Sequence, residues 1–181
     1  MKVELYHSSK YGNGELVAEE YKRLMTARGN DVNVHHIKNV NAKDLPPSDL
    51  YVFGSPTHFG KAVGSMIRFL IKANLPPGID YAVFATFSAA MPDKKTGKMP
   101  LDEELEKLRR TIPMMDDVLK AKGMVKIAEM KFFVNPNQMK GPLEDSWKEK
   151  VGEFVTQFFS ELRYPRDGQG TQVKRDFRSR R

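Results

Sequence analysis

Short apolar segments alternate along this chain with segments whose apolar residues recur at helical spacing. Lys2 to Tyr6 and Leu50 to Phe53 have the apolar and aromatic character of strands, and Tyr81 to Phe87 is an unbroken apolar run. Asp31 to Ile37 and the first half of Val125 to Val134 alternate apolar and polar residues, which is typical of half-exposed strands. This succession of strands and helices constrains the fold more than any other feature of the sequence.

Four segments carry the apolar stripe of an amphipathic helix. They are Gly14 to Arg28, Ala62 to Ala73, the long segment Leu101 to Leu119, and Trp147 to Leu162, whose stripe is the clearest. Pro113 is expected to kink or split the long segment, because proline removes a backbone donor and disfavours helix at the preceding residue.

Alternating strands and helices imply right-handed crossovers and a parallel sheet that is covered on both faces. The third and fourth strands are the most continuously apolar and are expected in the interior, with the second and fifth at the edges. The sequence therefore predicts an α/β fold: a doubly wound five-stranded parallel sheet of order 2-1-3-4-5 with helices on both faces. Ligands of such sheets bind beyond the carboxyl ends of the strands, between strands 1 and 3.

Composition and charge narrow the class of protein. The chain of 181 residues has no cysteine, which excludes disulfides, thiolate metal sites and cysteine nucleophiles. It shows no signal-peptide pattern and no apolar run near the roughly 18 residues of a membrane span, so a soluble, cytoplasmic protein is expected. Most of the net charge of +7 comes from residues 163–181, which hold seven basic and two acidic residues. We expect one domain over residues 1–162 and a basic, flexible tail over residues 163–181.

The first strand leads into a helix through Ser8-Ser9-Lys10-Tyr11-Gly12-Asn13-Gly14. Small residues let successive backbone N–H groups turn inward, serine hydroxyls add donors, and a helix N-terminus contributes a partial positive charge, all of which favour a phosphate. The spacing fits neither G-x-G-x-x-G nor G-x-x-x-x-G-K-[ST], so nucleotide hydrolysis is disfavoured. From this stretch alone, an ordinary turn with a helix cap is as good an interpretation as a phosphate site.

Two loops at the appropriate strand ends resemble those of the flavodoxin family. The run from Tyr6 to Asn13, YHSSKYGN, resembles the FMN phosphate loop, and GSPTHFG, Gly54 to Gly60, resembles the loop that lines the isoalloxazine ring. The segment KGPL at residues 140–143 also resembles these proteins, and the resemblance covers residues 1–162. The chain departs from the family pattern at Gly14, where threonine is usual, so one hydroxyl donor to the phosphate is missing.

The resemblance implies FMN as the cofactor, with its phosphate in the first loop and its ring between the loops after the third and fourth strands. The candidate cofactor-binding residues are Ser8, Ser9, Lys10, Tyr11, Gly12, Asn13, Gly14, Ser55, Pro56, Thr57, His58, Phe59, Gly60, Thr86, Phe87, Ser88, Ala89 and Ala90. Phe59 either stacks on or beside the flavin or is a buried anchor of its loop. His58 fits a solvent-facing histidine better than a flavin proton donor.

No metal site and no catalytic residue is expected. His35 and His36 are adjacent on a predicted edge strand and face opposite ways, which argues against a metal site formed by the pair. No serine lies in a nucleophile-elbow motif, so a Ser/His/Asp arrangement is not expected either.

By resemblance, the leading hypothesis is a flavodoxin-type one-electron carrier. The alternative is an enzyme, a flavodoxin-like NAD(P)H-dependent quinone or FMN reductase, in which the loop Ser88 to Pro100 would wall a pocket for a second flat substrate. A surface loop is the better interpretation of this segment. The expected partner is a redox protein, either an acidic, ferredoxin-like one or a reductase, and nucleic acid is disfavoured. The sequence leaves the choice between carrier and enzyme open, and also the oligomeric state.

Overall fold

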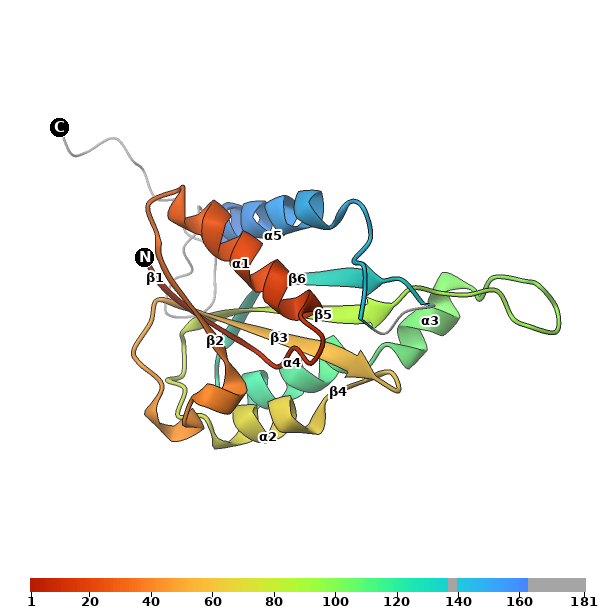
Figure 1. Cartoon of the computed structure of the whole chain (residues 1–181). Helices are drawn as coiled ribbons and strands as arrows, with labels where there is room; N and C mark the ends of the chain where they lie inside the picture. Colours follow the sequence, from red (N-terminus) through yellow and green to blue (C-terminus); the bar gives the residue numbers. More distant parts are fainter. Residues whose placement is uncertain (137–139, 163–181) are drawn as a thin grey trace.

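The computed structural model describes residues 1–136 and 140–162, and in this part of the chain a parallel sheet lies between two layers of helices (Figure 1). The parallel strands follow the order β2-β1-β3-β5-β6, and a two-residue strand, β4, pairs antiparallel with the end of β3. The strands are β1 Lys2–His7, β2 Asp31–His36, β3 Leu50–His58, β4 Lys61–Ala62, β5 Asp80–Ser88 and β6 Val125–Val134. Since β5 and β6 are the fourth and fifth of the predicted strands, the predicted order 2-1-3-4-5 is confirmed. The short β4 was not predicted.

Helices α1 and α5 cover one face of the sheet, and α2 and α4 cover the other (Figure 1). Because successive side chains of a strand point to opposite faces, Leu5 of β1 packs in the core under α1 and α5, whereas Tyr6 packs in the core under α2 and α4. The helices are α1 Asn13–Thr26, α2 Gly64–Lys72, α3 Asp102–Leu108, α4 Thr111–Ala121 and α5 Trp147–Leu162, with short 3₁₀ turns at Ile37–Asn39 and Ala42–Asp44. The predicted tail, residues 163–181, lies outside the described residues.

The long helical segment is split, but Arg109 and Arg110 separate its two parts rather than Pro113. Helix α4 begins at Thr111, so Pro113 lies in its first turn. Backbone N–H groups of a first turn have no intrahelical acceptor, and the proline therefore removes no hydrogen bond from the helix. The prediction of a break was right and its position was wrong.

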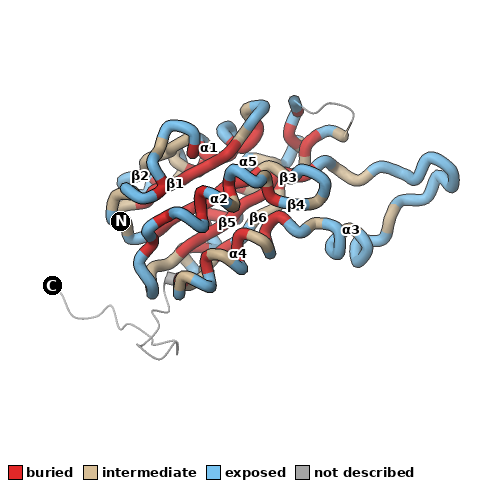
Figure 2. Tube along the Cα trace, turned by 90° about the horizontal axis from the view of Figure 1, so that it is seen from below, coloured by how far each residue is buried: buried red, intermediate tan, exposed pale blue. Residues whose placement is uncertain are grey.

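The segment between β5 and α4, residues 89–110, projects from the carboxyl-end edge of the sheet, and we call it the arm (Figure 1). Figure 2 shows exposed chain along most of its length, and α3 within it has no buried residue. The base of the arm is attached to the body: the Arg110 N–H donates to the Gly60 carbonyl at 2.6 Å, and the Arg109 guanidinium lies 4.7 Å from the centre of the Phe133 ring. The arm is therefore fixed at its base and exposed beyond it.

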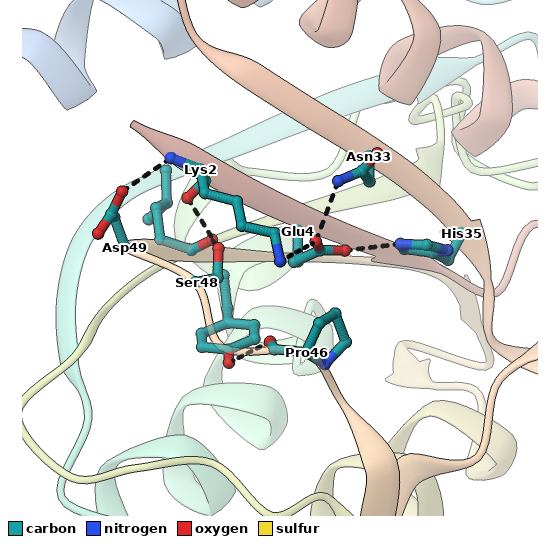
Figure 3. Close-up of polar contacts among 9 residues, drawn as sticks. Lys2, Glu4, Asn33, His35, Pro46, Ser48 and Asp49 are labelled. Carbon is teal, nitrogen blue, oxygen red and sulfur yellow. Dashed lines mark hydrogen bonds and ion pairs between the residues drawn. The ribbon is translucent and has the colours of Figure 1, made fainter.

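Glu4 is a buried carboxylate in β1 on the face of the sheet that α2 covers, and only 1% of it is exposed. It accepts hydrogen bonds from Asn33 Nδ2 at 3.0 Å and from His35 Nε2 at 2.6 Å, and Lys2 Nζ lies 3.4 Å from it (Figure 3). Asn33 and His35 both belong to the edge strand β2. Side chains therefore join β2 to β1 in addition to the backbone hydrogen bonds between them.

Replacement of Glu4 by alanine is expected to lower the free energy of unfolding by about 2–4 kcal/mol, because it opens a cavity and leaves its two β2 partners without an acceptor. Urea unfolding measures the change. Glu103→Ala, which removes an exposed ion pair with Lys107, is the control and is expected to change the free energy by less than about 1 kcal/mol. Equal losses in the two variants would show that the buried carboxylate has no special role in stability.

Candidate functional site

A cavity of about 430 Å³ opens at the carboxyl ends of β1, β3, β5 and β6. Its position is the one predicted from the winding of the sheet, next to the boundary between β1 and β3. Its volume lies within the range of roughly 300–1,000 Å³ that is typical of small-molecule and cofactor sites. The lining residues are Ser9, Lys10, Tyr11, Asn13, Pro56, Thr57, His58, Val63, Thr86, Phe87, Ser88, Val134, Asn135 and Pro136.

The three predicted loops meet at this cavity, although not every predicted residue lines it. Of the candidate residues, ten line the cavity: Ser9, Lys10, Tyr11, Asn13, Pro56, Thr57, His58, Thr86, Phe87 and Ser88. The others lie behind or beside the wall: Ser8, Gly12, Gly14, Ser55, Phe59, Gly60, Ala89 and Ala90. Several of these shape the loops through backbone contacts.

The loop after β1 presents free donors at the N-terminus of α1. Gly12, directly before the helix, is in the left-handed conformation with φ of 90°. As a glycine it has no side chain with which to cap the helix. The backbone N–H groups of Lys10, Tyr11, Gly12 and Asn13 find no acceptor within residues 1–136 and 140–162. The Ser8 hydroxyl is buried there without a partner as well. Unpaired donors at a helix N-terminus suit an anion, so this loop fits a phosphate group.

Gly14 departs from the family pattern, and the structure gives a reason. The Gly14 N–H donates to Ser9 Oγ at 3.1 Å, and a Cβ added at Gly14 would lie 3.3 Å from Ser9 Cβ. A threonine at this position would therefore press on Ser9 unless that residue moved by a few tenths of an ångström. The close packing of Ser9 on α1 accounts for the small residue.

The loop after β3 is a short hairpin that turns at Phe59 and Gly60, where φ is 49° and 74°. Two contacts with the start of α4 hold it in place: the Gly60 carbonyl accepts the Arg110 N–H, and the hydroxyls of Thr57 and Thr111 lie 2.6 Å apart. Behind the hairpin, Ser55 Oγ accepts the N–H of Val63 at 3.3 Å. These contacts fix the wall of the cavity that Pro56, Thr57 and His58 form.

Phe59 is not a buried anchor of its loop, because 91% of it is exposed. Its ring lies beside that of His58, with 4.5 Å between the ring centres. His58 lines the cavity and is itself exposed, as predicted for a solvent-facing histidine. An apolar ring this exposed, next to a residue of the cavity wall, is available for contact with another molecule.

The prediction missed the part of the wall that follows β6. Val134, Asn135 and Pro136 line the cavity, and so does Val63 before α2. A Cβ added at Gly141 would lie 2.8 Å from Asn13 Oδ1, so the segment at residues 140–143 packs on the phosphate loop. The predicted topology could have indicated these residues, since the carboxyl end of the fifth strand lies at the same edge of the sheet as the ends of the other strands.

The adjacent histidines of β2 face opposite ways, as predicted. The His35 ring stacks on Tyr6 with 5.0 Å between centres, whereas the His36 ring meets that of His7 at 5.1 Å. The described part of the chain holds no group of three or more side chains suited to a metal ion. Nor does any helix in that part have the length and apolar character to span a bilayer.

His7 ends β1 beneath the phosphate loop and is only 2% exposed. Its pKa is lowered from 6.5 to about 4, chiefly by burial and also by the neighbouring His36, while Glu15 of α1 opposes the change. Between pH 6.5 and 4 the unfolded chain therefore binds more protons at this residue than the folded chain, so stability rises with pH in that window.

Acidification from pH 7 to pH 4 is expected to remove about 3 kcal/mol of folding free energy through His7, since its pKa falls from 6.5 to about 4. Urea unfolding of the unchanged protein and of His7→Gln, each at both pH values, gives the loss of folding free energy on acidification for each. The loss of the unchanged protein minus that of the variant is the contribution of His7. His58→Gln, at an exposed histidine, should show the full acid loss. The same acid loss in His7→Gln as in the unchanged protein would contradict the assignment.

The comparisons with known proteins agree with this architecture. The family model for flavodoxin matches residues 5–131. Among solved structures, a flavodoxin from Streptococcus pneumoniae TIGR4 is 21% identical, with a TM-score of 0.62, 89% of this chain covered and 99% of that one. Flavodoxin 2 from Bacillus cereus is 19% identical, with a TM-score of 0.65 and the same coverage, and a flavodoxin from the domain Archaea is 16% identical, with a TM-score of 0.64 and coverage of 90% and 99%. A search of curated proteins gives no match.

A doubly wound sheet with a phosphate-type loop after its first strand and a cavity at its strand ends defines a flavodoxin-like protein. The family match extends over most of that sheet, and the chain belongs to the flavodoxin family. Flavodoxins bind FMN and transfer electrons to protein partners, and this is the function of the chain.

Proposed function

We propose that this flavodoxin holds FMN in the cavity at the strand ends, with the phosphate on the loop after β1 and the ring between the loops after β3 and β5. The observation that carries the proposal is the set of unpaired backbone N–H groups at the N-terminus of α1, next to a cavity of suitable volume. Lys10 lines the same cavity and supplies a positive charge to the phosphate.

Bound FMN supplies the redox chemistry of such a protein, and the chain supplies position and electrostatics. On the β3 side, the hairpin anchored to α4 gives a fixed wall against which a flat ring can lie. On the β5 side, Thr86 is buried, and Phe87 lies under the Arg109 guanidinium at 5.6 Å. Both walls are therefore supported from behind, which keeps the geometry of the site constant between one electron transfer and the next.

The partner that we propose is a redox protein with an acidic docking surface, such as a ferredoxin-like protein. Exposed lysines without an acidic partner in the described part of the chain lie beside the cavity and along the arm: Lys10, Lys61, Lys94, Lys95 and Lys98. Phe59 adds an exposed apolar contact next to a residue of the cavity wall. Lysines beside the cavity and on the projecting arm speed encounter with an acidic surface, and this effect weakens as salt rises.

The carrier is better supported than the reductase. A reductase needs a second flat substrate next to the ring, and the sequence offered the loop Ser88 to Pro100 as its wall. Only Ser88 of that loop lines the cavity, because the arm projects away from the sheet (Figure 1). A cytoplasmic location belongs to the same proposal, and cell fractionation tests it.

The spectrum of the purified protein tests cofactor binding: a yellow sample that releases FMN is expected, and a colourless protein that FMN does not titrate would refute the proposal. Mixing the holoprotein with NADH or NADPH without oxygen then separates the two functions. We expect no prompt bleaching of the flavin by the pure protein, since prompt bleaching is the result that a reductase gives.

A further inference from the structure

Two histidine rings lie directly beneath the phosphate loop and contact the backbone of one residue, Ser9. His7 Nδ1, at the end of β1, accepts the Ser9 N–H at 3.4 Å. His36 Nε2, at the end of β2, donates to the Ser9 carbonyl at 2.9 Å. The two rings meet edge to face with 5.1 Å between their centres, and His7 is almost fully buried.

These contacts define the proton positions on the His36 ring. Its Nδ1 accepts the Lys38 N–H at 3.1 Å, which caps the 3₁₀ turn after β2. With one ring nitrogen accepting and the other facing a carbonyl oxygen, the proton must be on Nε2 and the ring must be neutral. His7 is also an acceptor through Nδ1, so it too is in the neutral form.

Ser9 connects the loop after β1 to three other elements, β1, β2 and α1. Its backbone contacts histidines of β1 and β2, and its hydroxyl accepts the Gly14 N–H from α1. The four N–H groups without an acceptor in the described part of the chain begin at the next residue, Lys10. Any change in the orientation of Ser9 therefore changes the direction of the donors that follow it.

We propose that His7 and His36 are positioning residues that hold the phosphate loop in its anion-binding shape before the ligand arrives. The proposal rests on the proposed function, because the anion that the loop receives is the phosphate of FMN. A loop that is already ordered loses less conformational entropy on binding, and affinity rises accordingly. Neither ring lines the cavity, so their effect on the ligand passes through Ser9.

The charged and titratable groups near the pair come from several elements. Glu15 of α1 acts on His7 and favours its protonated form, and His35 of β2 opposes it. Lys38 lies two residues after His36, and Lys10 follows Ser9. A proton on either ring would remove an acceptor that the loop or the 3₁₀ turn uses.

The test compares FMN with riboflavin, which has the same ring system and no phosphate. His36→Phe keeps a ring but loses both nitrogens, so FMN should bind about tenfold more weakly while riboflavin binding stays the same. His36→Gln restores a donor and an acceptor on one side chain and should recover most of the FMN affinity. His35→Gln, one residue away on the opposite face, is the control and should leave the ratio of the two dissociation constants unchanged. Fluorescence titration of the apoprotein gives both constants.

Nitrogen-15 NMR of the histidine rings in the full-length apoprotein provides a second readout that needs no ligand. The expected result is a neutral Nε2–H tautomer for His36 at pH 7. The Nδ1–H tautomer, or equal weakening of FMN and riboflavin in His36→Phe, would overturn the role of the histidines. Failure of the unchanged protein to bind FMN would instead refute the proposed function, and the NMR result would still decide the role of the histidines in the loop.

Discussion

Replacement of Gly54 by alanine is expected to lower the free energy of unfolding by about 3 kcal/mol or more, the upper part of the range for overpacked cores. Gly54 lies in the middle of β3, paired with His7 on one side and Phe84 on the other. A Cβ at this position would lie 2.0 Å from Cζ of the Phe84 ring and within 2.6 Å of two more of its carbons. That ring is buried and packed against the rings of Phe132 and Phe154, so it cannot move aside without disturbing the core.

The double variant Gly54→Ala with Phe84→Leu makes the prediction specific. If the ring is the obstacle, the smaller side chain should relieve part of the loss, so the double variant should be more stable than the sum of the two single changes predicts. Gly152→Ala in α5 is the matched control, because a Cβ there meets nothing within 4 Å. Helix propensity predicts a gain of up to about 1 kcal/mol for it. Strict additivity in the double variant would rule out the steric explanation.

Replacement of Gly60 by alanine is expected to have the second largest effect, a loss of about 2–5 kcal/mol that combines backbone strain and overpacking. Gly60 has φ of 74°, and its added Cβ would lie 2.2 Å from the carbonyl oxygen of Leu108. That obstacle is backbone, which a rotamer change does not move. The hairpin after β3 would therefore separate from the start of α4, and the bond between Arg110 and Gly60 would break.

Gly97→Ala is the control for backbone strain alone, since Gly97 has φ of 69° and open space around it. Its expected loss is about 1–2 kcal/mol at most. Urea unfolding of both variants gives the stability difference, and FMN titration of Gly60→Ala shows whether the cavity wall has moved. Equal losses at the two positions would mean that contact between the hairpin and the arm is unimportant.

The fold could be predicted from local pattern because each strand and each helix has its own periodicity, and because parallel strands with helical crossovers allow few arrangements. The continuous apolar runs of β3 and β5 correctly placed these strands inside the sheet. The break in the long helix was misplaced because proline is unfavourable only where its missing N–H matters. In the first turn of α4 it does not matter, and no local signal distinguishes that turn from the middle of a longer helix.

The cavity could be predicted in position and in most of its wall, since the rule of strand ends depends on topology alone. What could not be predicted was the support behind the wall. The contacts of Thr57 with Thr111, and of Gly60 with Arg110, join residues about fifty positions apart, and neither pair has a recognisable motif. The exposure of Phe59 could not be predicted either, because its turn with positive φ carries no signal in the sequence.

The arm has a consequence for how this protein could change over time. Since α3 has no buried residue, and the arm contacts the body at Ala89 and between Glu106 and Arg110, the segment between these contacts can lengthen, shorten or exchange its sequence without repacking either core. Changes there would alter what meets the rim of the cavity while the sheet keeps its stability. Selection for new partners and selection for a stable fold therefore act on separate residues in this chain.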